Sequence, residues 1–326
     1  MLRFLVGFLS GLRCYSVFFL SVLTALHGVA AETESTTPAP LAAQLDRSTV
    51  EARGKQSALL SVNAFGRYAV TVNSSQGVAL QVVDRMSGMG EPSGQPGRQD
   101  GRLDFFLDRG AYKVLTHAAA DGKGQARLAA HAFVELQTHA PLLVEHRLEQ
   151  STLGDFEQRS YWLEVNEKRF VAIEAAGRHL ADLRLWRDGT WLVDAKPQLV
   201  QSQARPAQPL QVARLTAELT PGLYLLTAYG GPSLAWTEAS TQKPFYLRMG
   251  IPTLAPAMRQ PFTISEFGTD RFLVPAGPNY FRLELPVARS ASLQVGSYAQ
   301  DNPFAASGSG AYYASSPKLP AGVAAP

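Results

Sequence analysis

Hydrophobic and polar residues alternate in short runs over most of residues 58–240. In RYAVTVN, for example, Tyr68, Val70 and Val72 share one face. Because successive side chains of a strand point to opposite faces, a period of two is typical of strands that are buried on one side. No sustained helical period accompanies these runs. The pattern therefore predicts an all-β protein.

Turn-forming residues separate the predicted strands. Asp188-Gly189, between DLRLW and TWLVD, predicts a two-residue hairpin, because both positions then need a positive φ. The Gly- and Pro-rich stretch 87–101 excludes helix and central strand. Residues 126–150 fit a helix or strands, and the alternation after Pro141 favours strands. Short, frequent strands of this kind are typical of a sandwich or barrel.

A strand–turn–strand unit occurs twice, 112 residues apart. Gly110 and Gly222 suit the turn, and Tyr112 and Tyr224 begin the return strand on the core side. We expect each unit to close one antiparallel layer, so that the chain carries a repeat of roughly 90–110 residues. The identities between the two copies are Arg102/Arg214, Leu103/Leu215, Leu107/Leu219, Gly110/Gly222 and Tyr112/Tyr224.

These patterns predict tandem antiparallel β-sandwich modules, jelly-roll-like, with flexible N- and C-terminal segments. A third copy begins in the same strand order but lacks the closing strand–turn–strand unit. The expected organisation is a signal peptide (1–31), a linker (32–57), β-sandwich module 1 (58–150), module 2 (151–240), a partial third β module (241–303) and a low-complexity tail (304–326).

The N-terminus has the pattern of an export signal. Arg3 and Arg13 precede a 13-residue apolar core at 14–26, and small residues follow at 28–31. An uncleaved anchor is the alternative. Cys14 is the chain's one cysteine, so cleavage leaves no thiol for disulfides, thiolate catalysis or metal binding. The sequence predicts a periplasmic or secreted protein with no membrane span after signal removal.

The charge of the chain excludes one class of partner. The formal net charge is +3, and it falls to +1 without Arg3 and Arg13. No run of lysine and arginine with interleaved aromatic residues occurs, so no nucleic acid is expected as a partner.

Three runs of residues carry a resemblance to a known family. SYWLEV, ADLRLWRDG and LTPGLYL (160–165, 181–189 and 219–225) resemble the marks of the bacterial pre-peptidase C-terminal domain. The resemblance is strongest over 155–231, weaker over 58–117 and partial over 265–298. It implies a jelly-roll β-sandwich of exported bacterial proteins, of a kind that assists secretion, surface attachment or substrate binding. It also implies acids near loop ends, at Asp155, Asp182 and Asp188. The sequence departs from the usual setting of this family, because no peptidase accompanies the modules.

Two groups of residues are candidate binding sites. Asp100, Asp104 and Asp108 have even spacings around one strand, which suits calcium, although interleaved arginines make a solvated charge pattern the alternative. Apart from this candidate calcium site, no cofactor is expected. Trp186 and Trp191 flank the Asp188-Gly189 turn and would form an aromatic platform if both faced outward. The alternative is packing in the core, which is commoner for tryptophan in a small sandwich.

Catalytic motifs are missing from the sequence. It contains no Gly-x-Ser-x-Gly, no His-Glu-x-x-His and no phosphate-binding loop, and His131, His139 and His146 are loosely spaced. We therefore expect an exported non-enzymatic binding or scaffolding protein whose partner is another exported protein or a cell-surface polymer. The alternatives are a carbohydrate-binding module that uses Trp186 and Trp191, and a hydrolase with an unrecognised site.

Overall fold

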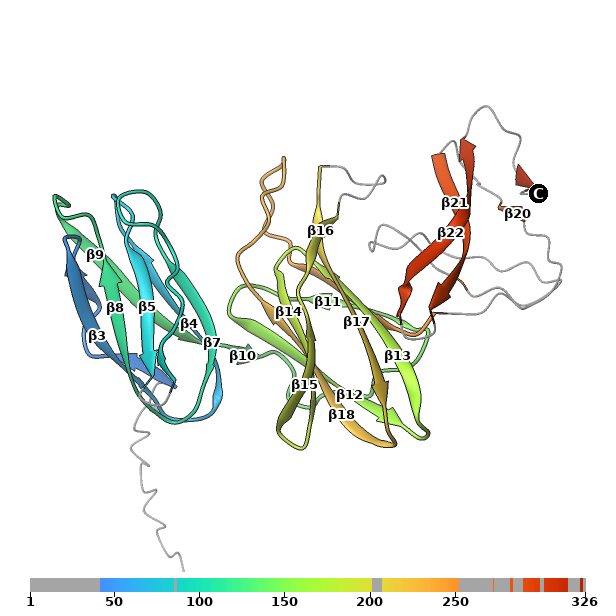
Figure 1. Cartoon of the computed structure of the whole chain (residues 1–326), viewed down its shortest axis with the longest axis horizontal. Coiled ribbons are helices and arrows are strands. Elements are labelled where there is room, and N and C mark those ends of the chain that lie inside the picture. Colours follow the sequence, from blue (N-terminus) through green and yellow to red (C-terminus); the bar gives the residue numbers. More distant parts are fainter. Residues whose placement is uncertain are drawn as a thin grey trace, which may run out of the picture. The chain divides into compact units, whose positions relative to one another are not determined.

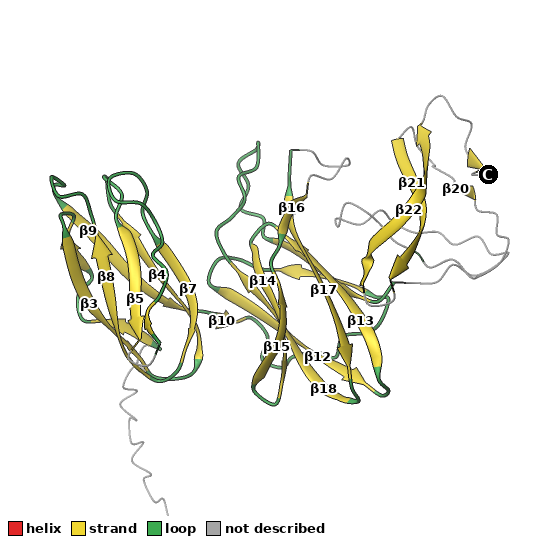
Figure 2. Cartoon of the chain, viewed as in Figure 1, coloured by secondary structure: helices red, strands yellow, loops and turns green. Residues whose placement is uncertain are grey.

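The predicted fold class is confirmed by the structure, a computed structural model, which is all-β and contains no helix among the described residues (Figures 1 and 2). Its sheets are antiparallel except for the short pairing of β10 (Val134–Glu135) with β12 (Glu157–Val165). The predicted signal peptide lies outside the described residues. The structure describes residues 42–84, 87–200, 207–251, 272, 282–283, 290–299, 302–315 and 323–324.

Two sheets form the first sandwich within the described part of the chain. Their strand orders are β1-β3-β8-β5-β6 and β2-β9-β4-β7. Leu60, Val70 and Val114 lie in the core between them and are fully buried. The strands are β1 (Ala43–Leu45), β2 (Thr49–Glu51), β3 (Lys55–Val62), β4 (Gly66–Asn73), β5 (Ala79–Asp84), β6 (Gly88–Met89), β7 (Arg102–Leu107), β8 (Gly110–His117) and β9 (Gln125–Ala132).

The second sandwich has the strand orders β10-β12-β18-β14-β15 and β11-β19-β13-β17-β16 among its described residues. Its core includes Leu183, Tyr224 and Phe245. The further strands are β11 (Leu148–Thr152), β13 (Arg169–Gly177), β14 (Leu180–Arg187), β15 (Thr190–Ala195), β16 (Gln198–Val200), β17 (Leu210–Leu219), β18 (Gly222–Gly230) and β19 (Pro244–Met249).

Both sandwiches use one topology. The order β3-β8-β5-β6 of the first corresponds to β12-β18-β14-β15 of the second, and β2-β9-β4-β7 corresponds to β11-β19-β13-β17. The sequence repeat thus marks equivalent places, since β7–β8 and β17–β18 are the matching pairs. The first and last residues of the sandwiches differ from the module bounds predicted from the sequence. The predicted linker 32–57 contributes β1, β2 and the start of β3, and β19 joins the second sandwich beyond residue 240.

The expectation that each repeated unit closes one layer is wrong. β7 pairs with β4 in one sheet, whereas β8 lies between β3 and β5 in the other. In the same way β17 and β18 belong to opposite sheets. The turn at Gly110 or Gly222 is therefore a corner that carries the chain across the sandwich. Alternation could not reveal this, because it shows which side of a strand is buried and not which strand is its neighbour.

The C-terminal part contains further strands. β21 (Ser290–Ala299) pairs with β22 (Asn302–Ser315), and β20 (Arg282–Leu283) pairs with β23 (Val323–Ala324). The predicted strand at 291–298 thus agrees with β21, whereas the predicted strand at 270–274 lies, except for Phe272, outside the described residues. β23 and all of β22 except its first two residues fall in the segment 304–326, predicted as a low-complexity tail.

Candidate binding surface

The sheet β10-β12-β18-β14-β15 has one face against its core and another that we call the outer face. On β14, Leu183 and Leu185 are fully buried in the core. The alternating residues Asp182, Arg184 and Trp186 therefore lie on the outer face. One part of this face contacts the first sandwich, and another part carries a row of partly exposed apolar side chains.

A buried ion pair joins the first sandwich to the outer face. Arg67, from β4, donates from Nη1 to Oδ2 of Asp182 over 2.7 Å, and both side chains are almost fully buried. Arg184 and Lys196 also reach Oδ2 of Asp182, at 2.8 and 2.9 Å. Burial raises the pKa of Asp182, but Arg67 and the hydrogen bonds from Lys196 and Arg184 outweigh it and lower the pKa. The carboxylate is thus held ionised.

Aromatic rings enclose the guanidinium of Arg67. Its Cζ lies 4.6 Å from the ring centroid of Tyr229, 5.0 Å from that of Phe133 and 5.5 Å from that of Phe106. Phe106 in turn packs edge-on against Trp186, with 5.3 Å between ring centroids. A planar cation surrounded by rings gains cation–π attraction that grows as water is excluded.

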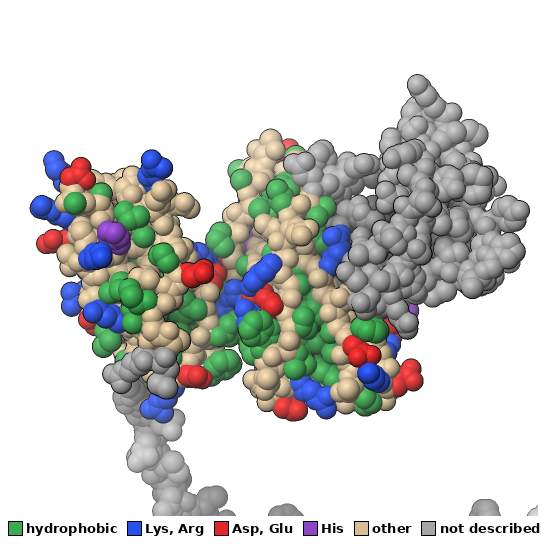
Figure 3. All heavy atoms as spheres, viewed as in Figure 1, with side chains coloured by type: hydrophobic (Ala, Val, Ile, Leu, Met, Phe, Trp, Pro, Cys, Tyr) green, Lys and Arg blue, Asp and Glu red, His purple; other side chains and the backbone are tan. Residues whose placement is uncertain are grey.

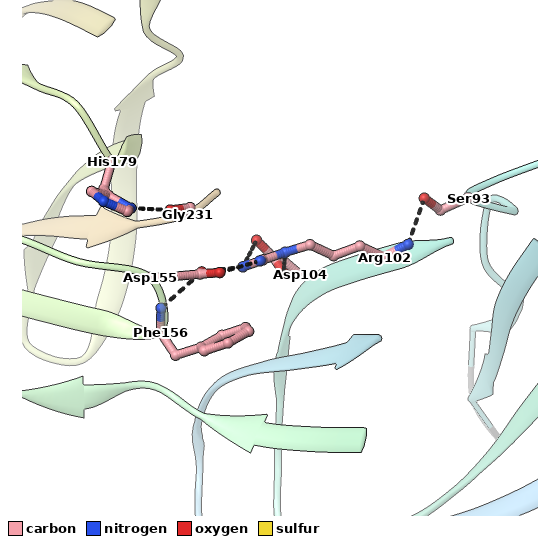
Figure 4. A network of polar contacts seen from close by, with 7 residues as sticks. All are labelled: Ser93, Arg102, Asp104, Asp155, Phe156, His179 and Gly231. Carbon is pink, nitrogen blue, oxygen red and sulfur yellow. Dashed lines mark hydrogen bonds and ion pairs between the residues drawn. The ribbon is translucent and has the colours of Figure 1, made fainter. Parts of the chain in front are cut away.

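A second ion pair crosses between the sandwiches closer to solvent (Figure 4). Arg102 donates from Nη1 and Nη2 to the two carboxylate oxygens of Asp155, each over 2.7 Å, and also binds Asp104. Its guanidinium lies 4.6 Å from the ring centroid of Phe156, which stacks on His131. Asp155 and Asp182, two of the three acids that the resemblance placed near loop ends, therefore both bind arginines of the first sandwich, whereas the third, Asp188, is exposed beside Arg187.

An apolar row crosses the outer face. Trp162 of β12 is paired in register with Leu225 of β18, which is paired with Trp186 of β14, which is paired with Trp191 of β15. Leu142 continues the row through a bridge to Trp162. We call these five residues the tryptophan row. Since neighbouring strands lie about 4.8 Å apart, Trp162 and Trp191 are about 14 Å apart across the sheet.

A β-bulge directs Trp191 toward the outer face. The register of β14 and β15 shifts between Leu185 and Trp186. The guanidinium of Arg184 lies 4.4 Å from the ring centroid of Trp191, which places that ring on the same side as Arg184. Bulges commonly redirect side chains in this way.

The tryptophan row is partly open to solvent. Trp162 is 39% exposed, Trp191 49% and Leu142 52%. Trp186 is half-buried because Phe106 of the first sandwich covers it. Neither Trp186 nor Trp191 lies in the core, so the interpretation as core packing is wrong for both. Sequence reasoning missed Trp162, although the alternation of SYWLEV places it opposite the buried Tyr161 and Leu163.

The three aspartates of the calcium hypothesis are engaged separately. Asp100 accepts hydrogen bonds from the backbone of Ser74 and Val78, and Asp104 binds Arg102. The backbone carbonyl of Asp108 accepts from Tyr112. Within the described ranges, no group of three or more histidine, cysteine, aspartate or glutamate side chains is placed to hold a metal ion. The structure thus does not assemble the predicted calcium ligands.

The predicted turn residues lie at the corners of the sandwiches. The hydroxyl of Tyr112 donates to the carbonyl of Asp108 over 3.0 Å, and that of Tyr224 donates to the carbonyl of Thr220 over 2.7 Å. Each tyrosine thus fixes the corner in which Gly110 or Gly222 begins the next strand.

Charged side chains of both signs are interspersed over the visible face of the molecule (Figure 3). A groove of about 490 Å³ lies apart from the tryptophan row and is lined by Phe156 and small residues such as Ala130. Its acids, Asp155 and Glu157, are paired with Arg102 and Lys243. No helix among the described residues is long and apolar enough to cross a membrane.

Comparisons with known proteins do not assign a family. No family model matches the chain, and no curated protein matches it. A solved structure with partial likeness is the stem and receptor binding domain of the spike protein P1 from bacteriophage PM2, at 8% identity, 63% coverage of this chain, 98% coverage of that chain and a TM-score of 0.11. A likeness at this level carries no argument. The resemblance to the pre-peptidase C-terminal domain stays a prediction.

Proposed function

We propose that this chain is an exported, non-enzymatic binding or scaffolding protein that uses the tryptophan row as its binding surface. The observation that carries the proposal is the row itself. Three of the chain's four tryptophans share it, and two of them remain substantially exposed. Export rests on the N-terminal sequence alone.

Exposed tryptophans in a row indicate a binding surface, because leaving their apolar area in contact with water is unfavourable unless a ligand covers it. Contiguous apolar area at the surface stays in contact with water, and such patches commonly mark interaction sites. Tryptophan is also the residue type that contributes most often to binding hot spots. Phe65, which is 58% exposed and lies 6.4 Å from Trp186 between ring centroids, extends the aromatic area from the first sandwich.

The contact around Arg67 supports a scaffolding role for the paired sandwiches. It covers one part of the outer face, orders Trp186 through Phe106 and leaves Trp162 and Trp191 accessible. A binding surface whose side chains are already packed loses less entropy when a ligand binds.

Co-sedimentation with insoluble cell envelopes tests this function. We expect the full chain to sediment with the envelopes, and a Trp162→Ala/Trp191→Ala variant to lose at least tenfold in affinity. A Leu59→Ala/Leu199→Ala variant removes two similarly exposed apolar side chains elsewhere and should bind as the parent does. Thermal unfolding verifies that both variants are folded.

Two results would contradict the proposal. One is envelope binding that the tryptophan variant leaves unchanged, because the row would then not be the surface used. The other is turnover of a peptide or glycoside substrate that a single histidine substitution abolishes, which would revive the hydrolase alternative.

A further inference from the structure

We infer that the tryptophan row binds a polysaccharide chain built of uncharged sugar rings. The inference rests on the proposed function and adds the chemical class of the ligand. It follows from the shape of the row, its chemistry and the charges around it.

The shape of the row fits an extended ligand. Its members lie on hydrogen-bonded neighbouring strands, so they form a strip across a sheet face, and Phe106 and Phe65 of the first sandwich border this strip at Trp186. Sites for small molecules are concave and enclose most of the ligand. The groove beside Phe156 does not include any member of the row. A strip about 14 Å long suits several consecutive units of a linear polymer.

The chemistry of the row fits sugar rings. A pyranose ring has apolar C–H faces and a rim of hydroxyl groups, so a flat aromatic ring can cover a face while polar neighbours bind the rim. Indole supplies a large rigid apolar face at low cost in side-chain entropy. Beside the row, Glu164 of β12 is exposed and can accept hydrogen bonds.

The charges around the row argue against a charged polymer. On the outer face Arg184 and Lys196 pair with Asp182, and Lys196 also lies 3.7 Å from Asp194. Glu164 of β12 adds a further acid beside the row. Binding of nucleic acids and other polyanions depends on a surplus of lysine and arginine, which this strip lacks.

The narrow width of the strip favours a polymer over a folded protein. Ser160 and Thr227, which border the row on one side, are buried and hydrogen-bonded to each other. Stable protein–protein interfaces cover about 800 Å² on each partner. On this side the apolar surface is one row wide, which suits a linear chain better than the broad face of a folded protein.

Affinity electrophoresis in gels that contain a soluble polysaccharide tests the inference. The probes are hydroxyethylcellulose, xylan, galactomannan and glycogen as uncharged chains, with alginate as a charged one. We expect at least one uncharged chain to retard the full-length protein. Trp162→Ala/Trp191→Ala should lose at least tenfold in affinity, Trp162→Phe should keep most of it, and Leu199→Ala should keep all of it. Tryptophan fluorescence should shift to shorter wavelength on binding.

The outcomes separate the inference from the proposed function. Envelope binding that depends on the row, without binding to any uncharged polysaccharide, overturns the inference and leaves the proposed function standing, with a protein as the partner. Retardation by alginate alone, removed by salt, also overturns it. Retardation that the double variant leaves unchanged overturns both.

Discussion

Three tyrosines fix corners of the fold through one residue spacing. Tyr68, Tyr112 and Tyr224 each donate their hydroxyl to the carbonyl four residues earlier. A glycine stands two residues before each of them, and a Cβ at Gly66 or Gly110 would contact the tyrosine ring at 3.5–3.6 Å. The Gly-x-Tyr signal for Tyr112 and Tyr224 was readable from the sequence. Gly66-Arg67-Tyr68 has the same signal and was missed, because it lies outside the 112-residue repeat.

The corner hydrogen bond predicts a cost for Tyr224→Phe. The substitution keeps the ring and leaves the carbonyl of Thr220 without this donor, so we expect a loss of about 1–2 kcal/mol in the free energy of unfolding. Urea unfolding measures it. Tyr246→Phe is the control, since its hydroxyl makes no hydrogen bond within the described residues, and an equal loss in both variants would contradict the role of the corner.

Tyr229 predicts a dependence of stability on alkaline pH. Burial raises its pKa to about 12, although the nearby Arg67 acts in the opposite direction. Below pH 10 the folded and unfolded states both keep the proton, so stability does not depend on this group. Between pH 10 and about 12 the unfolded state ionises first, and the free energy of unfolding falls by up to about 1.4 kcal/mol per pH unit.

Tyr229→Phe tests this pH dependence. Urea unfolding gives the free energy of unfolding of both proteins at each pH. Above pH 10 this free energy should fall less steeply with pH in the variant, by the contribution of about one titrating proton. Parallel curves for the two proteins would show that Tyr229 does not titrate as its burial requires.

At the scale of elements, turns and strands followed from the sequence but sheet membership did not. The Asp188-Gly189 hairpin has φ of 52° and 74°, as the prediction required. The strands at SYWLEV, RFVAIEA and DLRLW also agree with β12, β13 and β14. By contrast, the bulge that redirects Trp191 has no signal in the alternation, because it depends on the pairing of β14 with β15.

Gly189→Ala tests the conformation of this hairpin. A Cβ at Gly189 has nothing within 4 Å, so the substitution changes the backbone preference without a steric clash. We expect a loss of about 1 kcal/mol in thermal or urea unfolding, because φ of 74° disfavours alanine. Gly66→Ala is the control at a glycine without positive φ, where a Cβ would make only an ordinary contact of 3.5 Å with the ring of Tyr68. A Gly189→Ala variant as stable as the parent would contradict the described turn.

At the scale of the whole molecule, two arginines of the first sandwich, Arg67 and Arg102, bind acids of the second, and the pair of Arg67 with Asp182 is the more deeply buried of the two. Arg67 and Asp182 lie 115 residues apart in the sequence. Arg67 occupies an ordinary strand position, and Asp182 had been noted only through the family resemblance. Pattern reasoning found the two sandwiches but not their contact, because a buried ion pair has no local periodicity. The tryptophan row depends on this contact, since Phe106 packs on Trp186.

Scanning calorimetry of Arg67→Met tests this account most directly. Arg184 and Lys196 still neutralise Asp182 in this variant, so the loss is that of the charged hydrogen bond from Arg67, about 2–3 kcal/mol. The parent should unfold its two sandwiches in one transition, and the variant should show two separated transitions with the first at lower temperature. Arg109→Met, at an exposed position of the first sandwich, should match the parent. A single transition at the parent's midpoint in Arg67→Met would contradict the central claim that this ion pair holds the sandwiches together.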